Sequence, residues 1–232
     1  MNIGGLEKCS LVDFPGTTAA VVFTQGCNFR CGYCHNPELV YPTLFGQELP
    51  EATVLNFLRR RTGKLGGVVI TGGEPTIHQD LPEFIRAVKA LGFKVKLDSN
   101  GSNPAVLKSL YDEHLLDYVA MDIKGPMKSY SQVACALIEP DKILKSIEYI
   151  MHSGVPYEFR TTVVKSQIPP ADFDEIGELI RGSRLYILQK FNLPPAWKIC
   201  NQSFLASKAY TDEEFEQIRR RMESYVDVCT IR

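Results

Sequence analysis

Six short strand-like runs, each separated from the next by a helical pattern, constrain the fold more than any other feature of the chain. The runs are rich in valine, isoleucine and aromatic residues, a composition typical of buried strands. They lie at residues 19–23, 67–71, 94–98, 118–122, 157–164 and 185–189. Parallel strands need long crossover connections, usually helices, whereas antiparallel strands can be joined by tight turns. The alternation therefore predicts a parallel sheet built from right-handed βαβ units.

The segments between and after these runs carry apolar residues at spacings of three and four, the period of an amphipathic helix. Helices are expected at residues 52–61, 81–91, 104–114, 143–152, 173–182 and 212–225. The short apolar end at 226–231 is expected to pack on an edge of the sheet. At 232 residues the chain suits a single α/β domain. We divide it into a lead (1–16), a core (17–190) and a C-terminal extension (191–232).

Composition excludes several classes of protein. The hydrophobic fraction of 44% and the charged fraction of 23% are ordinary for a folded globular chain. A net charge of −1 offers no general attraction to nucleic acid. We see no signal peptide and no apolar run long enough to span a membrane. We therefore expect a cytoplasmic protein that has neither nucleic acid nor a membrane as its partner.

Polar residues without an obvious core role cluster at the carboxyl ends of the predicted strands. They are residues 27–34 after the first run, 71–75, 98–101 and 122–125 at the ends of the next three, Arg160 within the fifth, and 189–190 at the end of the sixth. In parallel α/β folds, open or closed, this edge of the sheet is where active sites are built. The sequence therefore predicts a single active-site face.

Cys27, Cys31 and Cys34 form a C-x3-C-x2-C pattern with no fourth cysteine nearby. A cubane iron–sulfur cluster normally binds four thiolates, so three thiolates leave one iron open. An open position is what distinguishes a catalytic metal site from a closed structural one. The triplet therefore favours a [4Fe–4S] cluster on whose vacant iron a second molecule can be held and reduced.

Other interpretations of the triplet stay open at this point. Cys31 and Cys34 have the C-x2-C spacing of a zinc site, to which His35 could be recruited. Unrelated buried thiols are a further alternative, whereas disulfides fit poorly with an odd number of cysteines. The scattered cysteines at positions 9, 135, 200 and 229 are expected to be small buried hydrophobic residues.

Two motifs together resemble the radical S-adenosylmethionine (SAM) enzymes. They are the cysteine triplet with Tyr33 before its last cysteine, and the segment Gly72-Gly73-Glu74-Pro75. Residues 10–16 and 26–37 resemble a narrower branch, the activases that install a glycyl radical in a partner enzyme. Within that branch the chain is most similar to the activating proteins of anaerobic ribonucleoside-triphosphate reductase.

The resemblance implies a fold, an activity and partners. The fold is an α/β partial (β/α)6 barrel, and the activity is that of a radical SAM oxidoreductase. Cys27, Cys31 and Cys34 would hold the [4Fe–4S] cluster, whose open iron would be chelated by SAM. An electron from flavodoxin or ferredoxin would cleave SAM, and the resulting radical would abstract a glycine Cα hydrogen from a glycyl radical enzyme. The protein's task is to orient the cofactor and to exclude competing reactions.

The resemblance also implies contacts with SAM. The expected residues are Tyr33, Gly72, Gly73, Glu74, Asp98, Ser99, Asn100, Asp122, Lys124 and Arg160. Gly72 and Gly73 let the backbone approach the methionyl amine, because neither carries a Cβ atom. Lys124 and Arg160 could bind the SAM carboxylate.

Some of these residues also have plainer interpretations. Asp98 and Asp122 resemble a pair that forms a monovalent-cation site in related activases, but turn capping or ion pairs with Lys96 and Lys124 would also explain them. Arg160 could be an ion-pair residue, and Tyr33 could be a core aromatic instead of an adenine contact.

Asp13 is predicted to contact the protein substrate. It lies in an Asp-Phe-Pro-Gly turn that resembles the substrate-contacting Asp-Gly-Pro-Gly segment of related activases, with Phe14 in place of the first glycine.

Three alternative functions remain. The chain could activate pyruvate formate-lyase or another glycyl radical enzyme. It could also be a small-molecule radical SAM enzyme resembling 7-carboxy-7-deazaguanine synthase. The third alternative is a cluster or zinc protein that senses redox state without turnover.

Overall fold

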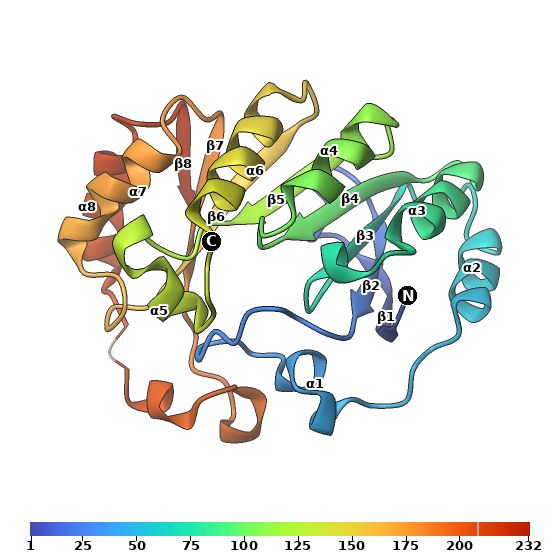
Figure 1. Ribbon diagram of the computed structural model, residues 1–232, viewed down its shortest axis with the longest axis horizontal. Coiled ribbons are helices and arrows are strands. Elements are labelled where there is room, and N and C mark those ends of the chain that lie inside the picture. Colours follow the sequence, from blue (N-terminus) through green and yellow to red (C-terminus); the bar gives the residue numbers. More distant parts are fainter. Residues whose placement is uncertain (208) are drawn as a thin grey trace.

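One eight-stranded sheet, in which the strands follow one another in sequence order, forms the centre of the molecule (Figure 1). The computed structural model describes residues 1–207 and 209–232. β1 runs antiparallel to β2, and each later strand pairs in parallel with the strand before it. The strands are β1 (Ile3–Ser10), β2 (Ala19–Thr24), β3 (Gly67–Gly72), β4 (Lys94–Ser99), β5 (Tyr118–Asp122), β6 (Tyr157–Val163), β7 (Leu185–Lys190) and β8 (Val228–Ile231).

The six predicted strands correspond to β2 to β7, and their ends agree with the prediction to within one residue. The sheet nevertheless has two more strands than the expected six. The lead forms β1 on one edge, and the apolar end of the chain forms β8 on the other, as its expected edge position implies. β1 and β8 each have a single neighbouring strand, so the sheet stays open as a partial barrel.

The predicted helices are present, and most end a few residues earlier than expected. The helices are α1 (Pro37–Val40), α2 (Glu51–Arg59), α3 (Leu81–Ala90), α4 (Pro104–Asp112), α5 (Tyr130–Ala134), α6 (Pro140–His152), α7 (Phe173–Leu179) and α8 (Asp212–Met222). α1 and α5 were not predicted, because four or five residues are too few to show a helical period. None of the helices in the described part of the chain could cross a membrane, because none is long and apolar enough.

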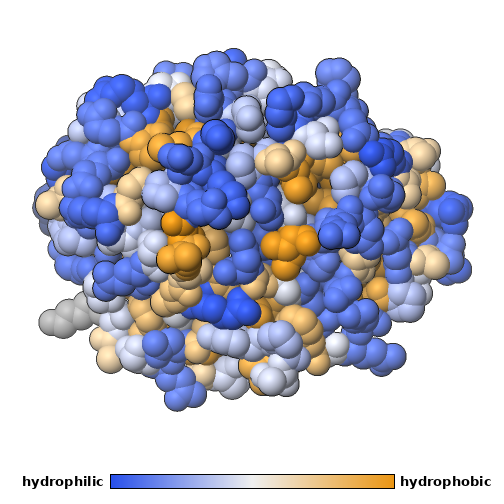
Figure 2. Space-filling model, viewed as in Figure 1, coloured by the Kyte–Doolittle hydropathy of each residue, from blue (hydrophilic) through white to orange (hydrophobic). Residues whose placement is uncertain are grey.

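The larger helices line the outer side of the sheet, whereas α1 and the segment that follows β7 lie on its other side (Figure 1). Val68 and Ile70 of β3 belong to the same buried core as Phe84 of α3. The main core therefore lies between the sheet and its outer helices. On the molecular face seen in Figure 2, by contrast, hydrophobic residues form only small separate groups among hydrophilic ones.

A second, smaller core closes the inner side of the sheet at its amino-terminal end. It consists of Phe14, Ala19, Val21, Val69 and Tyr118. Phe14 reaches this core from the turn between β1 and β2, and its ring lies 6.0 Å from that of Tyr118. A Cβ atom on Gly67 would lie 2.9 Å from the Phe14 ring, so the glycine makes room for it. Any ligand cavity on the inner side must consequently open towards the carboxyl ends of the strands.

Candidate active site

A cavity of about 410 Å³ lies at the carboxyl ends of the parallel strands. All of the residues predicted to bind the cluster or SAM line it: Cys27, Cys31, Tyr33, Cys34, Gly72, Gly73, Glu74, Asp98, Ser99, Asn100, Asp122, Lys124 and Arg160. These residues come from the cysteine loop, defined here as residues 25–36, from the ends of β3, β4 and β5, and from the middle of β6. The fold therefore assembles the predicted face in one place.

Asp13 does not belong to this group. Ser10, at the end of β1, pairs with Ala19 at the start of β2, so the intervening turn lies at the amino-terminal edge of the sheet. The Ser10 hydroxyl donates a 2.5 Å hydrogen bond to the Asp13 carboxylate. The cysteines follow the opposite end of β2. The role of Asp13 in contacting a substrate stays a prediction.

The cysteine loop is held by its own backbone and by α5. The Cys34 amide donates to the Cys31 carbonyl over 3.0 Å, and the Arg30 amide donates to the Ala134 carbonyl over 2.8 Å. Cys31 is buried, whereas Cys27 and Cys34 are half-buried. The loop therefore presents three thiols to the cavity from a backbone that is already fixed.

The donor set fits a cluster better than it fits one metal ion. Tetrahedral zinc bonds to sulfur at about 2.3 Å, which places its ligand sulfurs within about 4 Å of one another. Among residues 1–207 and 209–232, no three Cys, His, Asp or Glu side chains converge in this way. In a cubane each thiolate binds a different iron, so the ligands stand further apart. Cys27, Cys31 and Cys34 would hold such a cluster.

The thiols of the cluster-free protein differ in acidity. Burial, followed by the charge of Glu74, raises the pKa of Cys27 to about 12. Burial also raises the pKa of Cys31. A hydrogen bond from Cys200 lowers the pKa of Cys34 to about 7, against the opposing effect of burial.

Cys200 is a neighbour of the site that the sequence did not reveal. Its thiol hydrogen-bonds to that of Cys34, and its amide donates to the Cys34 carbonyl over 3.0 Å. The next amide, that of Asn201, donates to the Gly32 carbonyl over 2.9 Å. The expectation that every scattered cysteine is buried holds for Cys229 only, because Cys9 and Cys135 are exposed and Cys200 is half-buried. Sequence spacing carries no signal for a contact over such a separation.

The Glu74 carboxylate joins the end of β3 to the end of β4. Its Oε1 atom accepts hydrogen bonds from the Thr76 amide at 3.1 Å, from the Thr76 hydroxyl at 2.5 Å and from the Ser99 hydroxyl at 2.9 Å. Its Oε2 atom accepts from the Asn100 amide at 2.6 Å. Burial raises the pKa of Glu74 although these donors act in the opposite direction. Glu74 therefore shapes the loops around the cavity.

Gly72 and Gly73 allow two backbone segments to meet. A Cβ atom on Gly72 would lie 2.3 Å from the Thr24 nitrogen, and Gly72 has a φ of +118°. A Cβ atom on Gly73 would lie 1.9 Å from the Gly26 carbonyl oxygen. The Glu74 amide donates to the same oxygen over 2.8 Å. The protein backbone itself thus requires both glycines, whatever they contact in a bound cofactor.

Asn100 connects the β4 end to the cysteine loop. Its side-chain amide donates to the Asn28 side chain over 2.9 Å, and Asn28 in turn donates to the Ser102 hydroxyl over 2.8 Å. Because Glu74 already holds the Asn100 amide, three loops are joined around one residue.

Asp98 and Asp122 are fully engaged with cationic side chains. Lys96 contacts Oδ1 of Asp98 at 2.5 Å, and Arg160 contacts Oδ2 at 3.1 Å. Arg160 also contacts Oδ1 of Asp122 at 3.0 Å, and Lys124 contacts its Oδ2 at 3.0 Å. The ion pairs that the sequence left open as an alternative are therefore present.

These contacts also set the charges of the groups. Burial alone would raise the pKa of Asp122, but Lys124 and Arg160 more than offset it and lower the pKa to about 2. Burial would lower the pKa of Lys124, but Asp122 and the nearby Tyr33 raise it overall. Asp122 and Lys124 are consequently both charged at neutral pH.

Tyr33 is buried beside the site. Its ring meets Phe204 edge-on with the centroids 6.4 Å apart, and the Lys124 ammonium lies 5.9 Å from its centroid. Tyr33 is therefore a packed aromatic that also lines the cavity, and its contact with adenine stays a prediction.

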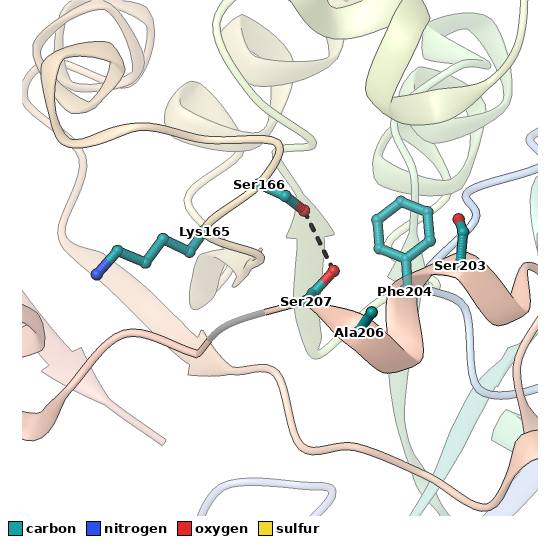
Figure 3. Close-up of a pocket in the computed structure, with 6 residues that line it drawn as sticks. All are labelled: Lys165, Ser166, Ser203, Phe204, Ala206 and Ser207. Atoms are coloured by element: carbon teal, nitrogen blue, oxygen red, sulfur yellow. Dashed lines mark hydrogen bonds between the residues drawn. The ribbon is translucent and has the colours of Figure 1, made fainter.

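A second hollow, of about 550 Å³, is lined by Phe204 together with residues 165–166, 203 and 206–207 (Figure 3). In Figure 3 the Ser166 and Ser207 hydroxyls face each other, 3.3 Å apart. Lys165 belongs to the lining, but its ammonium is paired with Glu214. This hollow does not bring together the titratable groups seen in the cavity of about 410 Å³.

The cavity has further lining residues that were not predicted to bind the cluster or SAM. They are Phe29, His35, Asn36, Val40, Thr71, Thr162, Gln189, Lys190 and Asn192. Thr71, Gln189 and Lys190 lie at strand ends already predicted to form the active-site face, and strand alternation could have identified Thr162 as well. Asn192 lies in a loop without any such pattern.

The comparisons with known proteins agree with this geometry. The family model described as the radical SAM superfamily matches residues 21–180. A protein of Methanocaldococcus jannaschii named as a glycyl-radical enzyme activating enzyme is 31% identical over 99% of this chain and 95% of its own length. The pyruvate formate-lyase 1-activating enzyme of Escherichia coli is 25% identical over 97% of this chain and 96% of its own. The 7-carboxy-7-deazaguanine synthase of Aquifex aeolicus is 33% identical over 88% and 84%.

A solved structure shows the same fold. Streptococcus suis SuiB bound to SAM superimposes with a TM-score of 0.67 at 14% identity, over 91% of this chain and 49% of SuiB. The chain thus spans about half the length of SuiB. Membership of the family implies a [4Fe–4S] cluster and SAM, and the donor set described above fits both. The chain belongs to the radical SAM superfamily, and it is an enzyme whose homologues include glycyl-radical enzyme activating enzymes.

Proposed function

We propose that the chain is an activase that abstracts a glycine Cα hydrogen from a partner enzyme and so installs a glycyl radical there. The partner we propose is anaerobic ribonucleoside-triphosphate reductase, because residues 10–16 and 26–37 resemble its activating proteins. The electron donor would be flavodoxin or ferredoxin. When bound, the cluster supplies one electron to SAM, and SAM cleavage gives methionine and the radical that takes the hydrogen.

The observation that carries this proposal is the cavity. Its volume of about 410 Å³ suits one ligand of cofactor size, and Phe14 closes the inner core beneath it. A substrate must therefore reach the bound cofactor from outside, through the open side of the sheet. A glycine on a loop of a partner protein can do so, because it brings its own scaffold.

The roles of the chain's own residues follow from their contacts. Cys27, Cys31 and Cys34 would hold the cluster from the fixed cysteine loop. The backbone at Gly72 and Gly73, which Glu74 holds in place, would contact the methionyl part of SAM. Ser99 and Asn100 would face the ribose, and Tyr33 would form a wall near the adenine.

The relatives support an activase of minimal size. The relatives from Methanocaldococcus jannaschii and Escherichia coli each match nearly the whole of this chain over nearly the whole of their own length. Their names state that they activate glycyl-radical enzymes, and the second names pyruvate formate-lyase. The choice of the reductase as partner rests instead on the resemblance of residues 10–16 and 26–37.

Electron paramagnetic resonance tests the proposal. The cluster-loaded protein, SAM, a reductant and the candidate reductase are combined without oxygen, and the spectrum is recorded. A glycyl-radical doublet is expected with the reductase, and a weaker one or none with pyruvate formate-lyase. The variant Cys31→Ala should give neither a doublet nor SAM cleavage. SAM cleavage with no doublet from either partner would sink the activase assignment.

A small-molecule radical SAM enzyme is the second candidate. The 33% identity to the Aquifex aeolicus 7-carboxy-7-deazaguanine synthase favours it. A screen of metabolites that monitors 5′-deoxyadenosine release separates the two. Release that is stimulated by a metabolite but not by a protein partner would support this candidate instead.

A further inference from the structure

Charged groups that line the cavity of about 410 Å³ form one network with Lys96 and Glu158 across three neighbouring strands. Lys96 and Asp98 lie on one face of β4, and Glu158 and Arg160 lie on the same side of β6. On β5 the residue paired with both Asp98 and Glu158 is Ala120. Because Ala120 is small, the Arg160 side chain can reach across β5 to Asp98.

Each oxygen of the two aspartates already has a cationic partner. Lys96 and Arg160 take the two oxygens of Asp98, and Arg160 and Lys124 take those of Asp122. A metal cation coordinated here would share an oxygen with an ammonium or guanidinium group and would stand beside that like charge. The monovalent-cation site expected from the resemblance therefore does not fit the side chains of this chain.

Charge balance leads to the same conclusion. Lys96, Lys124 and Arg160 face Asp98, Asp122 and Glu158, so positive and negative groups are equal in number. Arg232 lies 3.6 Å from Glu158 and adds a further positive charge at the edge of the network. One more cation would leave the network with an excess of positive charge.

Lys96 is the buried cation of this network that contacts Asp98. Its side chain is 2% exposed, its ammonium contacts Asp98 at 2.5 Å, and it lies 6.0 Å from the centre of the Tyr118 ring. A lysine ammonium is a compact point charge, and burial of such a charge requires a partner like Asp98. The other lysine of β4, Lys94, is exposed.

We propose that the buried Lys96 ammonium takes the place of a monovalent metal cation, so that SAM binding by this chain requires neither sodium nor potassium. Lys96 acts through Asp98 and is thus a positioning residue. It fixes the Asp98 carboxylate and neutralises its charge at the edge of the cavity. The inference rests on SAM binding in this cavity but not on which protein is activated.

Calorimetric titration of SAM into the oxidised, cluster-loaded protein tests this inference without any turnover. It is done in sodium, potassium and choline chloride at equal ionic strength. We expect the same dissociation constant in all three salts. A dissociation constant that falls at least tenfold when sodium or potassium replaces choline would overturn the inference.

The variant Lys96→Met keeps most of the length of the side chain and removes its charge. In choline chloride it should bind SAM at least about tenfold more weakly than the unchanged protein, because a largely buried carboxylate loses its partner. Sodium or potassium should restore much of that loss. Equal binding by Lys96→Met and the unchanged protein in choline would contradict the inference.

Two further variants separate this role from a purely structural one. Lys94→Met removes a lysine from the same strand and should bind SAM normally in every salt. Lys96→Arg keeps the positive charge and should stay independent of sodium and potassium, even if Lys96→Met folds poorly. If Lys96→Arg binding came to depend on sodium or potassium, the inference would be wrong. If the unchanged protein bound no SAM in any salt, the proposed function would fail as well.

Discussion

The Glu74 carboxylate accepts the main-chain amide of Asn100 over 2.6 Å and so joins the loop after β3 to the loop after β4. Glu74 is 1% exposed, and its two oxygens together accept four hydrogen bonds. Although Glu74 belongs to the Gly-Gly-Glu-Pro motif, its carboxylate is engaged by the protein itself. Its chief role is therefore to support the two loops that it joins.

Replacement of Glu74 by alanine is expected to destabilise the protein. It strands buried donors on Thr76, Ser99 and Asn100, and each stranded donor costs roughly 1–3 kcal/mol. We expect a loss of about 3 kcal/mol or more in the free energy of unfolding, measured with urea on the cluster-free protein. Glu83→Ala removes an exposed carboxylate and should change it by less than about 0.5 kcal/mol. Similar values for the two variants would refute the supporting role of Glu74.

Gly73→Ala is expected to separate the β3 loop from the cysteine loop. The new Cβ atom would lie 1.9 Å from the Gly26 carbonyl oxygen, so the backbone must shift. Such overpacking typically costs about 1–3 kcal/mol, and SAM affinity should fall with it. Calorimetry with SAM measures the second effect. Gly46→Ala meets no atom within 4 Å and serves as the control. A Gly73→Ala protein with unchanged stability and affinity would contradict the geometry.

Cys34→Ser and Cys200→Ser distinguish a cluster ligand from its neighbour. Cys34 belongs to the triplet that lines the cavity, whereas Cys200 lies outside the triplet and contacts the Cys34 thiol with its own thiol. After anaerobic reconstitution, Cys34→Ser should lose most of its iron and sulfide, and Cys200→Ser should keep a full cluster. Chemical iron and sulfide assays measure both. The assignment of ligands fails if Cys200→Ser loses the cluster and Cys34→Ser retains it.

The pH dependence of stability should report the ion pairs of Asp122. Its pKa is lowered from 3.8 to about 2, so the folded state favours the ionised carboxylate. This stabilisation is complete above the unfolded pKa, near pH 4, and is lost as the pH falls towards 2. It amounts to about 2 kcal/mol at most.

The comparison with Asp122→Asn isolates this contribution. Urea unfolding of both cluster-free proteins should show a gap in stability at pH 6 that shrinks as the pH approaches 2. Asp112 pairs with Lys108 on the surface, and Asp112→Asn should change stability by less than about 0.5 kcal/mol. A gap for Asp122→Asn that stays constant with pH would contradict the interpretation.

The presence of the six parallel strands could be predicted from the sequence, because strand-like runs alternate with helical patterns along the chain. The edge strand β1 gives a weaker signal, since Gly4 and Gly5 interrupt its pattern and three of its eight residues are exposed. α1 and α5 are too short to show a period. The sequence thus predicts the interior strands better than it predicts the edges and the short helices.

The residues of the site likewise fall into those that a local motif identifies and those that only the folded structure reveals. The cysteine triplet and the Gly-Gly-Glu-Pro segment identify their residues locally, and the fold brings them into one cavity. Whether Asp98 binds a metal cation or Lys96 depends on side-chain geometry across strands, which no local pattern contains. The contact between Cys34 and Cys200 joins distant parts of the chain and has no signature in the spacing of cysteines.

The cysteine loop is completed by residues near the end of the chain, since Cys200 and Asn201 donate to the carbonyls of Cys34 and Gly32. A ribosome adds about 5–20 residues per second, so the loop leaves it roughly 10–30 seconds before these partners exist. Until then the loop that carries the three thiols lacks the hydrogen bonds from the Cys200 and Asn201 amides. A protein truncated before residue 200 would keep the contacts of the loop with itself and with α5 but would lack these last two hydrogen bonds.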